Sequence, residues 1–182
     1  KANFPIGVEG GKTSTCPTQN LMEAYDMKDG TPFVWNNQSN PYDNRDPRMK
    51  YTIVCNEMKW PVDPVEIWEG GTNGLPLQNA TTTGYYLKKY VNNTISFEAG
   101  STVTKKQHNW VLFRYGEILL NYAEAMINAF HDPNYKDAVY NMSAREAVNQ
   151  IRGRTNISLP GFPSDITEKD FVKRLKNERR VE

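Results

Sequence analysis

Four aromatic side chains in stretches rich in Asn, Pro and Gly are the residues best suited to bind a ligand. Trp35 precedes a polar run at positions 36–40 and Tyr42 follows it, whereas Trp60 and Trp68 lie in a segment without regular periodicity. A Trp or Tyr ring offers an apolar face and a polar edge, and neighbouring amides and carboxylates supply the few placed polar groups of a binding site. That combination suits a sugar, whose C–H faces stack on rings while its hydroxyls seek hydrogen bonds. We rank the candidate ligand contacts Trp35, Trp60, Trp68 and Tyr42; the alternative for each is packing beneath a long loop.

Catalytic motifs are absent from the sequence. It contains no phosphate-binding Gly loop, no HExxH and no nucleophile elbow. A glycoside hydrolase needs two carboxylates placed across a sugar, and the 21 acidic residues leave that alternative open. The acids that can be placed, Glu117 and Glu124, fall on the solvent face of a helix. We therefore expect no enzymatic activity, no cofactor and no metal site.

Composition restricts the possible partners further. The chain has 182 residues, which is enough for one ordinary domain. Its formal net charge of +1 is too small to attract nucleic acid or an anionic membrane. No apolar run approaches the roughly 20 residues of a membrane span. Cys16 and Cys55 fit no metal-binding spacing, and we expect two free thiols rather than a disulfide.

The longest helical pattern, at residues 109–130, must provide the scaffold for these loops. Its apolar residues recur at steps of three and four, which predicts an amphipathic helix with one face in a core. The residues expected on that face are Tyr115, Ile118, Leu119, Tyr122, Ala125, Met126 and Ala129.

Shorter patterns predict the remaining elements. Thr18 is suited to cap a short helix over residues 18–25, and Ser143 with Glu146 forms a capping box; a similar start follows Thr167. Alternating apolar and polar residues predict strands at 49–55 and 83–91. The segments between them lack periodicity. The expected fold is therefore mainly α, with long irregular loops and a few short strands.

Six stretches of the chain resemble the SusD/RagB family in the family's order. The most specific are RYGEILLNYAEA in the long helical pattern, NRDPR before the first expected strand, and ERRVE at the end. The full set is residues 17–33, 41–56, 83–91, 109–129, 145–156 and 168–182.

The resemblance implies a tetratricopeptide-like helical scaffold of which this chain is the C-terminal portion. Residues 1–108 would be a loop-rich, ligand-facing segment and residues 109–182 a helical scaffold, together forming one partial SusD-like domain. The family's ligand contacts vary and assign none of the four aromatic candidates.

The resemblance also implies a function at the cell surface of Bacteroidota. Family members are outer-membrane lipoproteins that bind glycans, or in some cases peptides, and deliver them to a SusC-like TonB-dependent transporter. The lipid anchor would be an N-terminal cysteine, a role that neither Cys16 nor Cys55 fits. The alternative from another class is a helical-repeat module that binds peptide or protein in a concave groove.

Overall fold

A computed structural model describes residues 2–7, 10–36, 40–60, 63–92, 94–95, 107, 109 and 111–182. These residues form two compact units. Unit 1 comprises Lys1–Glu23 and Met49–Asn109, and unit 2 comprises Ala24–Arg48 and Trp110–Glu182. Part of the polar run after Trp35, at positions 37–39, lies outside the described residues, as does most of the expected loop before position 109.

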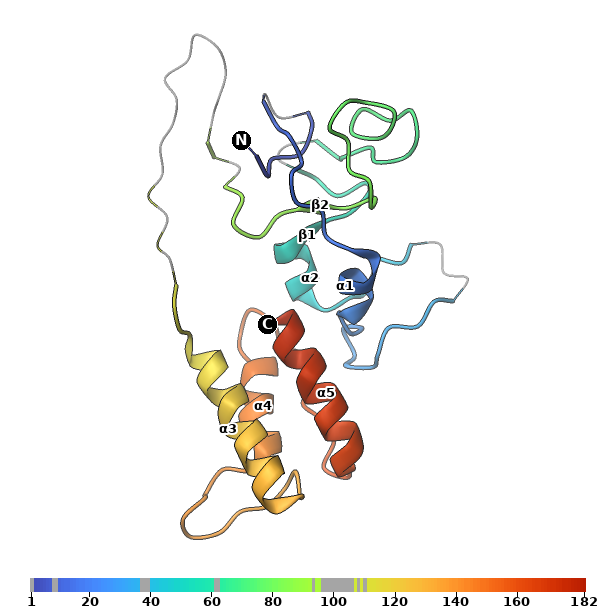
Figure 1. Ribbon diagram of the computed structural model, residues 1–182. Helices are drawn as coiled ribbons and strands as arrows, with labels where there is room; N and C mark the ends of the chain where they lie inside the picture. The colour runs from blue at the N-terminus through green and yellow to red at the C-terminus, as the bar shows by residue number, and fades with distance from the viewer. Residues whose placement is uncertain are drawn as a thin grey trace. The chain divides into compact units, whose positions relative to one another are not determined.

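Three helices form the core of unit 2. They are α3 (Tyr115–Phe130), α4 (Ala144–Arg152) and α5 (Glu168–Val181), which lie side by side in Figure 1. The hydrophobic cluster between them, to which the α4–α5 connection adds Phe162, consists of Leu119, Leu120, Ala123, Met126, Ile127, Ala144, Ala147, Val148, Ile151, Phe162, Phe171 and Leu175. Apolar burial of this kind is the main stabilising contribution in a helical unit. The expectation of a mainly α fold is confirmed.

The starts of α4 and α5 follow from their caps. The Ser143 hydroxyl accepts a hydrogen bond from the Glu146 amide, and the Glu146 carboxylate accepts one from the Ser143 amide, which completes the predicted capping box. The Thr167 hydroxyl accepts a hydrogen bond from the Asp170 amide at 3.2 Å. Both predicted helix starts are confirmed.

Helix α3 differs from its prediction in length and in the face it buries. Residues 111–114 are not helical, and the helix begins at Tyr115 after an extended Arg114. Of the residues expected in the core, Leu119 and Met126 are buried, whereas Tyr115 and Ile118 are 69% and 53% exposed. The buried stripe instead includes Ala123, whose small side chain lets another helix approach closely. Contact with α4 and α5 selects this stripe over the neighbouring one, which has the same periodicity.

Unit 1 is mostly irregular. Strand β1 (Ile53–Val54) pairs antiparallel with β2 (Tyr86–Leu87), with Ile53 opposite Leu87. The short helix α1 (Gln19–Ala24) begins where the Thr18 hydroxyl accepts a hydrogen bond from the Leu21 amide at 3.2 Å. The core of the unit consists of Ile6, Val54, Trp60, Val65, Ala80 and Tyr86.

The predicted strand at 49–55 is wrong for most of its length. Helix α2 (Pro47–Thr52) occupies that segment, and only β1 remains extended. The reason lies in two start signals: an Asp46 carboxylate oxygen accepts the Arg48 amide at 2.9 Å, and Pro47 stands at the first helical position, where its fixed φ is favourable. The strand expected at 83–91 is shortened to β2.

Buried charges connect three parts of the unit 2 sequence. Arg48 contacts carboxylate oxygens of Asp46 at 2.7 Å, Glu178 at 2.5 Å and Glu182 at 3.0 Å. Arg152 also pairs with Glu178, at 2.7 Å. These side chains are almost fully buried, so the network has no free cation available for an external anion among them. No described helix combines the length and apolarity that a bilayer crossing requires.

Candidate ligand-binding surfaces

Trp68 lies on an ordered, exposed loop of unit 1, which we call the Trp68 loop (residues 66–77). Its side chain is 48% exposed. The Gly71 amide donates to the Trp68 carbonyl oxygen at 2.9 Å, and the Gly70 amide donates to the Leu75 carbonyl oxygen at 2.7 Å. Two further apolar side chains of the loop, Leu75 and Leu77, are also exposed. The loop therefore exposes one aromatic and two aliphatic side chains on a hydrogen-bonded backbone.

One buried side chain, that of Asn73, links the base of the Trp68 loop to the rest of unit 1. Asn73 is 9% exposed, and its Nδ2 donates to the Ile6 carbonyl oxygen at 2.8 Å. Its Oδ1 accepts from the Glu66 amide at 3.0 Å, while its own amide donates to the Glu66 carbonyl oxygen at 2.9 Å. The Tyr86 hydroxyl donates to the Asn73 carbonyl oxygen. Sequence reasoning missed Asn73 because two of its partners, Ile6 and Tyr86, lie 67 and 13 positions away along the chain.

Trp60 is placed in the core of unit 1. Its side chain is 7% exposed and packs in the cluster with Val54 and Tyr86. Among the described residues its buried Nε1 has no hydrogen-bond partner. The Lys88 ammonium lies 5.2 Å from the ring centroid, and burial lowers the pKa of Lys88. Little of this ring is left to stack on a ligand.

Trp35 is exposed on unit 2 and supported from one side. It is 52% exposed and meets Phe33 edge to face, with ring centroids 5.2 Å apart. The Arg45 guanidinium lies 3.7 Å from the Phe33 centroid and donates to the Tyr25 carbonyl oxygen at 2.7 Å. These contacts through Phe33 support one part of Trp35 and leave the rest of its surface open.

Tyr42 is half-buried in a turn of the same unit. Its amide donates to Asn40 Oδ1 at 2.9 Å, and Asn40 Nδ2 donates to Asp43 Oδ1 at 3.3 Å. The structure therefore places Trp35 and Tyr42 in unit 2, and Trp60 and Trp68 in unit 1.

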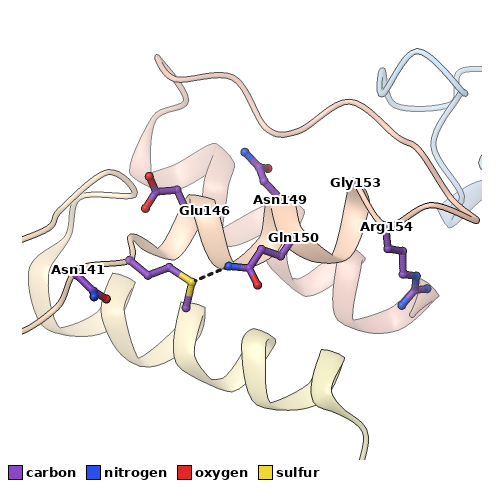
Figure 2. Close-up of a pocket in the computed structure, with 7 residues that line it drawn as sticks. Asn141, Glu146, Asn149, Gln150, Gly153 and Arg154 are labelled. Carbon is purple, nitrogen blue, oxygen red and sulfur yellow. Dashed lines mark hydrogen bonds between the residues drawn. The ribbon is translucent and has the colours of Figure 1, made fainter.

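An open pocket with mostly polar lining residues lies along α4 (Figure 2). Its volume is about 670 Å³, and it is lined by Asn141, Met142, Glu146, Asn149, Gln150, Gly153 and Arg154. Lys136 donates to Glu146 at 2.8 Å and, with the Ser143 amide, lowers the pKa of that carboxyl. The sequence pattern at these positions predicts only the solvent-exposed face of an amphipathic helix. It does not predict a pocket there.

Most polar groups of the α4 pocket already have partners in the protein. Gln150 Nε2 donates to the Met142 sulfur at 3.0 Å, as Figure 2 shows. Asn149 Oδ1 accepts from the Phe162 amide at 2.7 Å, and Arg154 contacts Glu182 through both terminal nitrogens. The exposed aromatic rings are therefore the better candidates for a sugar. In the part of the chain that the structure describes, no three His, Cys, Asp or Glu residues are grouped closely enough to hold a metal ion.

Comparison with known proteins identifies similar chains. A family model described as the SusD family matches residues 4–182. A SusD-like carbohydrate binding protein from Bacteroides fragilis aligns over 99% of this chain and 35% of its own, with a TM-score of 0.75 and 24% identity. A second SusD-like protein from the same organism aligns over 94% of this chain and 34% of its own, with a TM-score of 0.71 and 25% identity. A comparison with curated proteins finds no match. The chain thus spans about a third of the length of these solved structures.

Proposed function

This chain belongs to the SusD family, and from that premise we propose that it binds an oligosaccharide or polysaccharide. The observation that supports the proposal best is an exposed tryptophan in each unit: Trp35, whose ring contacts Phe33, and Trp68, which lies on a loop with internal backbone hydrogen bonds. One of the matched solved structures is described as a carbohydrate binding protein, which agrees with this function.

The proposed recognition combines stacking with hydrogen bonding. A pyranose ring would place its C–H face against Trp35 or Trp68, while hydroxyls bond to nearby exposed groups such as Asn36, Glu69 and Thr72. Tyr42 is half-buried and would contribute an edge rather than a ring face. Trp60 lies behind the surface and would act by supporting the unit 1 core.

Delivery to a transporter completes the proposal. The protein would act at the bacterial outer membrane, held there by a lipid anchor, and would pass its glycan to a SusC-like TonB-dependent transporter. Family membership is the support for this step. Co-purification of the transporter with the protein from detergent-extracted outer membranes tests it, and recovery of the protein alone would contradict it.

Native gels cast with different polysaccharides test binding itself. We expect retardation of the chain in at least one gel containing amylopectin, xylan, galactomannan or chondroitin sulfate, relative to a gel without polysaccharide. Release of reducing sugar from the retarding polysaccharide would instead indicate a glycosidase. No retardation, together with binding to peptides in a titration, would favour the helical-repeat peptide-binding module and refute the glycan proposal.

A further inference from the structure

The Trp68 loop depends on close backbone approaches around its turn. A Cβ atom built on Gly74 would lie 2.0 Å from the Trp68 carbonyl oxygen, and one on Gly71 would lie 2.5 Å from the Glu66 carbonyl oxygen. Since real Cβ contacts are never this short, any side chain at either position would displace the backbone. Gly70 has φ +85, a conformation that glycine adopts at little cost. The conformation that presents Trp68 is therefore specified by three glycines.

Asn73 joins this turn to two other parts of unit 1. Its side chain bonds Ile6 on one side and Glu66 on the other, and its carbonyl oxygen accepts from Tyr86 of β2. A Cβ on Gly7, which has φ +93°, would lie 2.6 Å from Asn73 Nδ2, so a side chain at position 7 would displace this amide. Asn73 thus fixes the base of the loop to the rest of unit 1, while the Trp68 side chain remains exposed to solvent.

We propose that Asn73 is a positioning residue that holds the Trp68 loop in its binding conformation before a glycan arrives. This inference rests on the proposed function, because it takes Trp68 as a sugar contact. A loop whose backbone groups are already hydrogen-bonded loses little conformational entropy when a ligand binds, and this smaller entropy loss makes binding tighter. The ligand class that this loop fits is a sugar unit with an exposed C–H face, stacked on the exposed ring of Trp68.

The test measures loop order and binding separately in the full 182-residue chain. Backbone amide hydrogen exchange reports on residues 66–77, and gels containing amylopectin, xylan, galactomannan or chondroitin sulfate report on binding. The variants are Asn73→Ala and Trp68→Ala, with Gln78→Ala as the control because Gln78 is exposed just beyond the same loop.

We expect Asn73→Ala to speed exchange in residues 66–77 by about tenfold or more, since the Glu66 amide loses its acceptor and the Ile6 carbonyl oxygen loses its donor. Exchange in α3 and α5 should stay unchanged. Retardation in the gel should fall to the level of Trp68→Ala, although Trp68 is still present. Asn73→Asp keeps the acceptor for Glu66 but places a carboxylate oxygen against the Ile6 carbonyl oxygen, so it should disrupt the loop and binding at least as much as Asn73→Ala. Gln78→Ala should match the unmodified chain in both.

Gly74→Ala perturbs the turn without touching the Asn73 side chain, which keeps the test valid if Asn73→Ala fails to fold. It should weaken retardation in the same way. Faster loop exchange with undiminished retardation, or unchanged loop exchange in Asn73→Ala, would overturn the inference. If the unmodified chain is retarded in none of the gels, the proposed glycan function fails and the binding role of Asn73 fails with it, whatever the exchange result.

Discussion

Replacing Arg48 by methionine should destabilise unit 2 far more than replacing an exposed arginine. The Arg48 side chain is only 5% exposed and reaches three carboxylates, those of Asp46, Glu178 and Glu182. Methionine keeps an unbranched side chain but removes the guanidinium. Glu178 retains Arg152 as a partner and Glu182 retains Arg154, whereas Asp46 loses its only ion pair among the described residues.

The expected cost follows from burial. Removing one partner of a buried ion pair costs about 3–5 kcal/mol, because a charge is left without compensation. Folded domains have total stabilities of about 5–15 kcal/mol, so the loss is a large share. For a chain of this length it corresponds to a fall in Tm of about 6–20 °C.

Thermal and urea unfolding, followed by circular dichroism, measure the effect. The matched control is Arg179→Met, which breaks the pair of Arg179 with Glu124 at 2.7 Å, where both side chains are substantially exposed. An exposed pair contributes less than about 1 kcal/mol. Equal losses in the two variants would refute the reasoning that burial decides the strength of these pairs.

A pH series supplies a second readout of the same network. Burial would raise the pKa of Glu182, but hydrogen bonds and charge from Arg154 and Arg48 outweigh it and lower that pKa. A carboxyl with a lowered pKa in the folded state stabilises fully above its unfolded pKa, about 4.3, and loses that contribution as the pH falls through the folded value. The stability difference between the unmodified chain and Glu182→Gln should therefore shrink below about pH 4; a difference that stays constant down to pH 2 would contradict the assignment.

Three further predictions concern single elements. Trp60→Ala should cost about 3–5 kcal/mol of stability because it empties part of the unit 1 core, whereas Trp68→Ala should cost under about 1 kcal/mol because its side chain is exposed. Urea unfolding measures both losses, and similar values would contradict the different burial of the two tryptophans. Ser143→Ala should destabilise the protein by about 0.5–2 kcal/mol through loss of the capping box, and an unchanged urea midpoint would contradict this. Leu112 and Phe113 are exposed before α3; their double replacement by serine should lower binding of a dye that reports apolar surface, and unchanged fluorescence would count against an apolar patch there.

The sequence predicts those features that depend on residues close together along the chain, such as helix starts. The caps at Ser143 and Thr167 were predictable because donor and acceptor lie three positions apart. The strand prediction for 49–55 is wrong because the helix start at Asp46 and Pro47 overrides the alternation of apolar residues that follows it. The buried face of α3 is predicted only in part: Leu119 and Met126 are buried, but Tyr115 and Ile118 are exposed, since two adjacent stripes share the same period.

The candidate site shows where sequence reasoning ends. Trp60 and Trp68 lie in the same irregular segment and have similar neighbours, yet one packs in the core and the other is exposed. Only long-range contacts separate them. Asn73 bonds to Ile6 across 67 positions of the chain, and no local pattern marks such a partner.

The most direct test of the account is calorimetric titration with oligosaccharides prepared from the four polysaccharides of the gel panel. We predict saturable binding of at least one of them to the unmodified chain, and loss of that binding in the double variant Trp35→Ala, Trp68→Ala with stability retained. Undiminished binding in the folded double variant would contradict the role of the exposed tryptophans. Absence of binding to every oligosaccharide would contradict the proposed function itself.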